Sequence, residues 1–204
     1  MKCEKETMLL YAVTDRMWTG RQTLMEQVED ALKGGATCVQ LREKELDEES
    51  FLKEAIEMKA LCAKYGVPFI VNDNVEIAIK CKADGIHVGQ SDMEAGNVRV
   101  LVGEDMIIGV STKKAGADYL GVGAMFHTGT KLDAEEVSRE AAQEITAAVD
   151  IPVVAIGGIN KKNILELKGT GVDGVALVSA IFGAENIEEE CKTLKALSAE
   201  MVQA

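Results

Sequence analysis

The chain has 204 residues, a length typical of one compact domain and close to the lower end for an eight-stranded α/β barrel. We therefore expect a single domain that spans residues 1–204. The formal net charge of -12 argues against a nucleic-acid-binding surface, because such surfaces need clustered Lys and Arg side chains. An anionic small molecule would have to be held by a few local cations.

Membrane insertion and disulfide formation are both disfavoured by the composition. The first six residues are charged rather than apolar, and no apolar run approaches the roughly 18 residues of a membrane span. The five cysteines are odd in number and form no Cys-x-x-Cys pair, which fits reduced, individually buried thiols. We therefore expect a cytoplasmic protein that contacts no membrane.

Short apolar segments alternate with helical patterns from one end of the chain to the other. The segments are rich in Val, Ile and Leu and largely lack polar-apolar alternation, as expected where both faces of a parallel sheet are covered. Intervening stripes such as Ile187, Cys191 and Leu194 predict helices with one apolar face. The expected strands are Leu9–Thr14, Thr37–Arg42, Pro68–Asn72, Gly85–Gly89, Met106–Val110, Asp118–Gly123, Pro152–Ile156 and Gly174–Val178.

A weak internal repeat supports this alternation. Similar glycine-containing tetrapeptides at 33–36, 82–85, 115–118 and 171–174 each precede or begin an expected strand. A glycine at this position ends a helix and lets the chain turn back. Strands and helices that alternate in this way form parallel sheets with right-handed crossovers, and eight units favour a closed (β/α)8 TIM barrel over an open sheet.

One crossover is too short for its helix. Only residues 112–117 separate Ser111, after the fifth expected strand, from Asp118 at the start of the sixth. Parallel neighbours usually need a connection of about a dozen residues, whereas six residues reach at most about 22 Å when extended. We expect the helix between strands five and six to be missing or shortened, and a real deletion would leave an exposed apolar strip on the barrel wall beside Ser111. The sequence leaves open whether this is a real deletion or residues that are not written in it.

Cationic side chains follow the second expected strand. Gln40, Arg42 and Lys44 alternate along the chain, so an extended backbone would project all three to the same side. Arg42 can bind a phosphate through two donors, and Lys44 can neutralise it as a compact charge. The competing interpretation, an exposed charged run that enters a helix, is equally supported by this segment alone.

Two carboxylates follow the next two strands. Asp73 ends the third expected strand and Asp92 follows the fourth, and neighbouring strands lie about 5 Å apart. One Mg²⁺ between them would complete its coordination with water and substrate phosphate oxygens. The alternative is that each carboxylate caps the helix that follows it.

Anion-binding groups also follow the sixth, seventh and eighth strands. Thr128, Thr130 and Lys131 surround a glycine after the sixth strand and would clasp an anion, unless the segment is a solvated turn. Residues 157–158 and 178–180 occupy the places where many barrels bind phosphate through backbone N–H groups.

Three aromatic or imidazole side chains are interpreted as structural. His87 lies inside the fourth expected strand, and no ligand partner is spaced with it, so we expect a satisfied core residue or one that supports a neighbouring site residue. Tyr11 and Trp18 lie near the first strand and are best explained by core or rim packing.

Seven segments in order, from about Leu10 to Phe182, closely resemble the thiamine phosphate synthase family. They are QLREK at 40–44, VND at 71–73, HVGQSD at 87–92, GVS at 109–111, TGTK at 128–131, IGGI at 156–159 and VSAI at 178–181. The resemblance implies a (β/α)8 enzyme that joins hydroxymethylpyrimidine diphosphate to a thiazole phosphate and releases pyrophosphate with Mg²⁺. It departs from the family at residues 112–117, where the family has a full helix.

The same resemblance implies roles for individual residues. Asp73 and Asp92 would ligate Mg²⁺, and the catalytic groups would be Arg42, Lys44, Ser111 and Lys131. The residues that would contact the pyrimidine diphosphate are Gln40, Leu41, Arg42, Glu43, Lys44, Asn72, Ser111 and Lys131. Those that would hold the thiazole phosphate are Thr128, Gly129, Thr130, Gly158, Val178 and Ser179. The implied mechanism ionises the C–O bond to a pyrimidine methylene cation, so the protein must mainly stabilise departing pyrophosphate.

Two other functions stay open at this point. A related thiazole tautomerase shares the barrel and the thiazole phosphate end but needs neither the diphosphate site nor the metal. A noncatalytic barrel that binds a thiazole or thiamine phosphate is compatible with the short fifth crossover. The synthase is favoured by the residues retained for the diphosphate and the metal, which are Arg42, Lys44, Asp73, Asp92 and Lys131. A homo-oligomer is compatible with the sequence, which determines neither the oligomeric state nor the thiazole variant.

Overall fold

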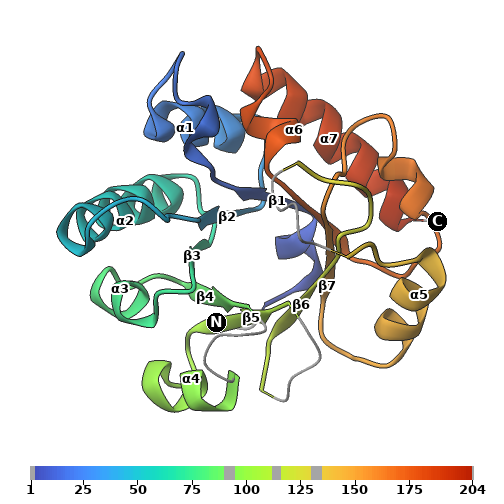
Figure 1. Ribbon diagram of the computed structural model, residues 1–204, viewed down its shortest axis with the longest axis horizontal. Helices are drawn as coiled ribbons and strands as arrows, with labels where there is room; N and C mark the ends of the chain where they lie inside the picture. Colours follow the sequence, from blue (N-terminus) through green and yellow to red (C-terminus); the bar gives the residue numbers. More distant parts are fainter. Residues whose placement is uncertain (1–2, 90–94, 112–115, 130–134, 204) are drawn as a thin grey trace.

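Eight parallel strands form a closed barrel, and helices surround it (Figure 1). The computed structural model describes residues 3–89, 95–111, 116–129 and 135–203. Neighbouring strands pair in sequence order, and β8 returns to pair with β1. The strands are β1 Leu10–Val13, β2 Cys38–Leu41, β3 Phe69–Asn72, β4 Gly85–Val88, β5 Ile107–Val110, β6 Tyr119–Val122, β7 Val153–Ile156 and β8 Gly174–Leu177. The expected barrel is therefore confirmed, and each expected strand agrees with the observed one to within a residue at either end.

The helices occupy the crossovers between the strands. The α-helices are α1 Leu24–Lys33, α2 Glu48–Lys64, α3 Val75–Lys80, α4 Ala95–Val102, α5 Arg139–Ala147, α6 Ser179–Phe182 and α7 Ile187–Val202. Three short 3-10 helices are η1 Lys5–Met8, η2 Arg16–Trp18 and η3 Ile164–Leu167. Local sequence signals fix where the first two α-helices begin. Thr23 and Glu26 form a capping box at α1, and Asp47 caps α2. No helix in the described part of the chain is long and apolar enough to cross a bilayer.

The strands separate two apolar cores. On β5, Ile107 packs inside the barrel, whereas Ile108 and Val110 pack outward against the helix layer. The interior core also contains Tyr11 and Tyr119. Since both faces of every strand are covered, the strands show the continuous apolar composition noted in the sequence.

In the connection from β5 to β6 the structure describes Ser111 and residues 116–118, and these contain no helix. Figure 1 shows the outer layer passing from α4 to α5 at this point. The expected exposed apolar strip is nevertheless wrong, because the outward-facing side chains of both strands are buried. These side chains are Ile108, Val110, Leu120 and Val122. Arg99 of α4 also reaches past β5 and pairs with Asp118, which directly precedes β6, so α4 stabilises the start of β6.

The internal repeat has a structural explanation at the N-terminal end of the barrel. The side chain of the residue before each even-numbered strand accepts the backbone N–H of one residue in the preceding strand. In return, its own backbone N–H donates to the carbonyl of that strand residue. We call these four two-bond contacts the strand-start clasps. They join Thr37 to Leu10, Asp84 to Phe69, Asp118 to Ile108 and Asp173 to Val153.

A cation completes each of the three carboxylate clasps. Lys59 Nζ lies 2.6 Å from Asp84, and Lys5 Nζ lies 2.8 Å from Asp173. Arg99 pairs with Asp118 and also donates to two backbone carbonyls. Each of these carboxylates thus makes two strong interactions, one with a backbone N–H and one with a cation. The repeat therefore encodes strand pairing rather than a ligand site.

Candidate active site

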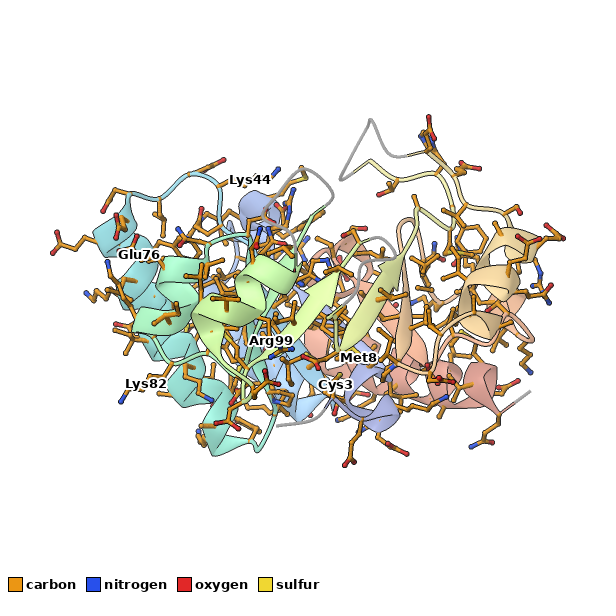
Figure 2. All side chains as sticks on the ribbon, turned by 90° about the horizontal axis from the view of Figure 1, so that it is seen from below. Cys3, Met8, Lys44, Glu76, Lys82 and Arg99 are labelled. Atoms are coloured by element: carbon orange, nitrogen blue, oxygen red, sulfur yellow. The ribbon has the colours of Figure 1, made fainter. Side chains whose placement is uncertain are left out.

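The candidate site occupies the C-terminal rim, by which we mean the C-terminal ends of the strands and the loops that follow them. Figure 2 shows Lys44 at this end of the barrel, with Cys3 and Met8 at the opposite end. Because all eight strands are parallel, every predicted site residue that the structure describes follows or ends a strand at the rim. The predictions for Asp92, Thr130 and Lys131 lie outside the described residues.

The two residues that end β2 point to opposite sides of its wall. The Gln40 side chain lies in the barrel interior, where its amide nitrogen donates to Tyr11 Oη at 2.8 Å. Leu41 is fully buried in the outward-facing core. Its side chain therefore contributes packing, and the backbone is the part of Leu41 that remains near the rim.

Arg42 is held in place by the loop that follows β1. Its backbone N–H donates to Thr14 Oγ1 at 3.0 Å, and its Nη1 donates to Asp15 Oδ2 at 3.1 Å. Asp15 is itself anchored, since its carboxylate accepts the Met17 N–H and so caps η2. A guanidinium has five N–H donors, so this single pairing leaves Arg42 able to bind an anion.

The Glu43 carboxylate shapes the loop that carries Lys44. Its side chain is only 2% exposed, and one oxygen accepts the N–H groups of Lys44, Glu45 and Leu46 at 2.7, 2.8 and 3.3 Å. The other oxygen pairs with Arg16 at 2.5 Å. Burial opposes ionisation, but the amides and Arg16 outweigh it and hold the pKa of Glu43 below its usual value. The carboxylate is therefore an anchor for the loop.

Asp73 has an unusual backbone conformation at the end of β3. Its φ is +62°, a left-handed conformation that is uncommon for a residue other than glycine. The Asp73 N–H donates to the His87 carbonyl at 2.8 Å, and Asn72 Nδ2 donates to Asp73 Oδ2 at 2.6 Å. Such strain costs on the order of 1 kcal/mol and clusters at functional sites. The geometry therefore supports a functional role for the Asp73 carboxylate.

The oxygen chemistry at Asp73 fits Mg²⁺, which takes carboxylate, water and phosphate oxygens. The described residues contain no cluster of three or more His, Cys, Asp and Glu side chains that would hold a metal by themselves. Magnesium does not require one, since it commonly uses one or two carboxylates and completes its octahedron with water and substrate. Asp73 is thus a suitable first ligand for a metal that arrives with a phosphorylated substrate.

A continuous set of hydrogen bonds crosses the barrel interior and ends at Ser111. Tyr11 Oη lies 2.8 Å from Tyr119 Oη, and Tyr119 Oη lies 2.9 Å from His87 Nδ1. His87 Nε2 then lies 2.9 Å from Ser111 Oγ, which is exposed at the rim. Together with the bond from Gln40 to Tyr11, these contacts form what we call the interior hydrogen-bond chain. His87 is half-buried, and both of its ring nitrogens have a hydrogen-bond partner, so of the two expected roles the contacts favour support of a neighbouring residue.

Sequence reasoning missed Tyr119 altogether and assigned Tyr11 to packing alone. A signal was present in the neighbouring strand, because a Cβ atom at Gly109 would overlap the Tyr119 ring. A glycine inside a strand often marks such a close approach. The positioning roles of Thr14 and Asp15 were also missed, since nothing near them in the sequence connects them to Arg42.

The end of β7 and the loop after β6 pack against each other. Gly157 and Gly158 have φ values of +96° and +66°, which favour glycine. A Cβ atom at Gly158 would meet the backbone carbonyls of Phe126 and His127. The two predicted thiazole phosphate segments, around Thr128 and at Gly158, are therefore brought side by side.

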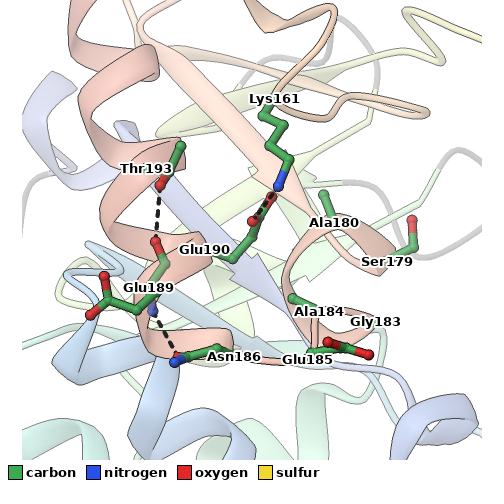
Figure 3. A pocket seen from close by; sticks show the side chains of 10 residues that line it. All are labelled: Lys161, Ser179, Ala180, Gly183, Ala184, Glu185, Asn186, Glu189, Glu190 and Thr193. Carbon is green, nitrogen blue, oxygen red and sulfur yellow. Dashed lines mark hydrogen bonds and ion pairs between the residues drawn. The ribbon is translucent and has the colours of Figure 1, made fainter.

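A surface depression of about 450 Å³ lies beside the end of β8, between α6 and α7 (Figure 3). Ser179 lines it, as does Lys161, whose Nζ lies 2.8 Å from Glu190. Asn186 also lines it and caps α7 through the Glu189 N–H. Several polar groups of the depression are thus engaged with each other, and the phosphate-binding role of Val178 and Ser179 stays a prediction.

The cysteines do not form a reactive centre. Burial raises the pKa of Cys3, Cys62 and Cys191 to about 12, and it raises that of Cys38 well above its ordinary value. A thiol with a raised pKa is a poor nucleophile because little thiolate is present. The expectation of reduced, buried thiols agrees with this environment.

Comparison with known proteins identifies the family. A family model described as thiamine monophosphate synthase matches residues 10–181. A thiamine-phosphate synthase of Alkaliphilus oremlandii (strain OhILAs) is 50% identical, over 92% of this chain and 94% of the relative. One from Clostridium botulinum (strain Eklund 17B / Type B) is 49% identical, over 91% of this chain and 92% of the relative.

A solved structure agrees with these relatives. A thiamine phosphate pyrophosphorylase from Pyrococcus furiosus superposes with a TM-score of 0.88 and is 36% identical, over 97% of this chain and 98% of that one. The similarity thus extends over the whole barrel as well as over the rim segments. The chain belongs to the thiamine monophosphate synthase family.

Proposed function

We propose that this protein joins hydroxymethylpyrimidine diphosphate to a thiazole phosphate, forms thiamine phosphate and releases pyrophosphate with the help of Mg²⁺. The observation that carries the proposal is the arrangement of Arg42, Asp73 and Ser111 after β2, β3 and β5, on one arc of the rim. A cation, a metal-binding carboxylate and a hydroxyl are the groups that a diphosphate leaving group needs.

The reaction breaks one bond and forms one. The C–O bond between the pyrimidine methylene and the diphosphate breaks, and its electron pair leaves with pyrophosphate. The lone pair of the thiazole nitrogen then forms the new C–N bond to the methylene cation. Negative charge therefore grows on the departing diphosphate, and groups that stabilise this charge lower the barrier.

Arg42, Lys44, Lys131 and Ser111 would stabilise the departing diphosphate. The net charge of -12 makes such local cations necessary, because the protein as a whole repels the substrate. Arg42 is preset by Asp15 at 3.1 Å, and the loop of Lys44 is preset by Glu43. Preset donors contribute more than flexible ones because they need no reorganisation during the reaction. Gln40, Asn72 and the backbone of 41–43 would complete the contacts to the pyrimidine diphosphate.

Asp73 and Asp92 would hold Mg²⁺ together with oxygens of the diphosphate. When bound, the ion would supply positive charge to the leaving group. The left-handed backbone of Asp73 aims its carboxylate from the end of β3, and Asn72 supports the carboxylate with a hydrogen bond of 2.6 Å.

The opposite side of the rim would hold the thiazole phosphate. Its binding groups would be Thr128, Gly129, Thr130, Gly158, Val178 and Ser179. The close packing of the Gly158 turn against the backbone of Phe126 and His127 supports a single site built from the loops after β6 and β7. This site lies where many (β/α)8 barrels bind phosphate.

A pyrophosphate-release assay with omitted components tests the proposal. We expect pyrophosphate only when both phosphorylated substrates and Mg²⁺ are present, and thiamine phosphate in equal amount. Arg42→Ala should lower turnover by about 100-fold, as expected for the loss of one preset charge-stabilising group. Lys192→Ala on α7, whose ammonium pairs with Glu188 and Glu189, is the matched control and should leave turnover unchanged.

Two other results would replace the proposal. Isomerisation of a thiazole phosphate without any use of the diphosphate would establish the tautomerase. Tight binding of thiamine phosphate without turnover would establish a noncatalytic binding protein.

A further inference from the structure

The interior hydrogen-bond chain links two residues of the proposed pyrimidine diphosphate site across the barrel. Gln40 at the end of β2 and Ser111 after β5 are joined only through Tyr11, Tyr119 and His87 in the contacts described above. Tyr11 and Tyr119 are separated by 108 positions in the sequence. Their hydroxyls replace what would otherwise be apolar packing in the interior core. Buried polar groups of this kind specify one arrangement when all their bonds are made.

The direction of each hydrogen bond follows from the number of protons available. Burial raises the pKa of Tyr11 and Tyr119 well above the usual value, so each keeps its single hydroxyl proton. The Tyr11 oxygen accepts an N–H from Gln40 at 2.8 Å, and Tyr11 therefore donates its own proton to Tyr119. Tyr119 in turn donates to His87 Nδ1 at 2.9 Å.

The same count of protons determines which nitrogen of His87 carries a proton and where the Ser111 hydroxyl proton points. An imidazole that accepts at Nδ1 and is neutral carries its proton on Nε2. His87 Nε2–H then donates to Ser111 Oγ at 2.9 Å. The Ser111 oxygen therefore accepts the hydrogen bond from His87 on the side of the barrel interior. Its hydroxyl proton is directed away from His87, toward the rim.

The neighbouring strand is adapted to this arrangement. A Cβ atom at Gly109 would overlap the Tyr119 ring, so the β5 glycine admits the ring to the barrel interior. The Tyr119 ring also packs edge-on against Tyr11, with ring centroids 5.9 Å apart, and lies 5.6 Å from the His87 ring. Phenylalanine in place of Tyr119 would keep these ring contacts and remove only the hydroxyl.

We propose that Tyr119 is a positioning residue that acts through His87 to direct the Ser111 hydroxyl proton toward the diphosphate of the substrate. This inference rests on the proposed function for the identity of the anion. Tyr119 does not touch the substrate, and its role is to keep Ser111 a hydrogen-bond donor. A donor aimed at the diphosphate becomes more effective as charge builds up during ionisation, so its loss should lower kcat more than it weakens substrate binding.

The first test measures the proton positions directly and does not depend on turnover. The chain has two histidines, so ¹⁵N-histidine labelling gives two ring systems, and His127→Gln identifies the His87 signals. We expect His87 to be protonated on Nε2 and unprotonated on Nδ1, and Tyr119→Phe to shift this signal. Tyr65→Phe is the matched control, because the Tyr65 hydroxyl donates to Glu29 outside the barrel at 2.8 Å. A proton on Nδ1, or a signal unchanged by Tyr119→Phe, would overturn the inference.

The second test asks whether Tyr119 acts through Ser111. Tyr119→Phe should lower kcat by about 10- to 100-fold, the range typical of groups that orient a functional side chain, with the KM for the thiazole phosphate unchanged. In a Ser111→Ala background the same substitution should change kcat by no more than about twofold, because the group that it orients is gone. Equal losses in both backgrounds would show a general packing defect and contradict the inference. A wild-type protein with the expected His87 tautomer but no turnover would instead contradict the proposed function.

Discussion

The two ends of the barrel use polar side chains in opposite ways. At the N-terminal end the same device recurs four times, and each strand-start clasp joins neighbouring strands through two hydrogen bonds. Among the described residues of the C-terminal rim, the strands are followed by groups of several kinds, such as the Arg42 guanidinium, the Asp73 carboxylate, the Ser111 hydroxyl and the glycine at 157. A contact that is repeated around the barrel serves a requirement that all strands share, which is pairing with a neighbouring strand. The varied groups at the rim are instead suited to bind one asymmetric ligand.

The partners of the carboxylates differ in the same way. Asp84 accepts a backbone amide and an ammonium group, so its charge is neutralised by the fold itself. The Asp73 carboxylate also accepts a hydrogen bond, from Asn72, but Asp73 is exposed and its backbone adopts a left-handed conformation. A carboxylate whose charge is balanced within the fold stabilises it, whereas one held at a rim under strain is suited to bind a ligand. Substitutions at the two ends should therefore separate activity from stability.

The largest effect is expected for Asp73→Asn at the rim. Asparagine also tolerates the left-handed backbone, so the fold should be retained while one charge for Mg²⁺ is lost. We expect kcat/KM to fall by about 100-fold and the Mg²⁺ requirement to rise, as measured by pyrophosphate release across a Mg²⁺ titration. Unchanged rates at limiting Mg²⁺ would remove Asp73 from the site. The matched substitution at the other end, Asp84→Asn, should leave kcat/KM unchanged.

The next effect is on stability and concerns Asp84→Ala. This change leaves the Phe69 N–H and the Lys59 ammonium without their acceptor. The free energy of unfolding should fall by about 2–3 kcal/mol, which is the range for a hydrogen bond to a charged group plus an unsatisfied amide. Urea unfolding measures the change, and kcat/KM of the folded variant should equal that of the wild type. A loss of activity without a loss of stability would reverse the assignment of the two ends.

Glu43→Gln sharpens the comparison because Glu43 lies at the rim but acts structurally. The folded pKa of Glu43 lies below its usual 4.5, so its ionised form adds stability that is fully present above pH 4.5 and is lost as the pH falls through the lowered pKa. At neutral pH we expect Glu43→Gln to lower the free energy of unfolding by about 1.5–3 kcal/mol. Urea unfolding on both sides of pH 4.5 should show the difference shrinking in acid. A difference that grows in acid would contradict the assignment.

The smallest effect is expected for Lys5→Ala at the N-terminal end. The Lys5 side chain is 67% exposed, so its pairing with Asp173 is screened by water. The free energy of unfolding should change by less than about 0.5 kcal/mol. Arg99→Ala should cost more, because Arg99 is mostly buried and also donates to the carbonyls of Gly103 and Met106. Equal losses for the two variants would show that burial does not set the strength of these clasps.

Local patterns in the sequence were sufficient to predict the barrel. Apolar runs such as 69–72 and 153–156, each followed by a polar turn, identify parallel strands because these signals act within a few residues. The position of the candidate site followed from the same patterns, since parallel strands bring their C-terminal ends together. The glycines at 157 and 158 were recognisable for the same reason, as they mark a backbone turn.

Only the tertiary structure decided which distant side chains meet. Tyr11 and Tyr119 share a hydrogen bond across the barrel, and Asp15 holds Arg42 from the loop that follows the neighbouring strand. The burial of Leu120 beside a crossover without a described helix was likewise not predictable. The sequence by itself thus determined the strands, their order and the end that carries the candidate site, because these depend on local backbone preference and periodic burial. Partnerships across the barrel depend on closure of the sheet, which brings residues together only once all eight strands have paired.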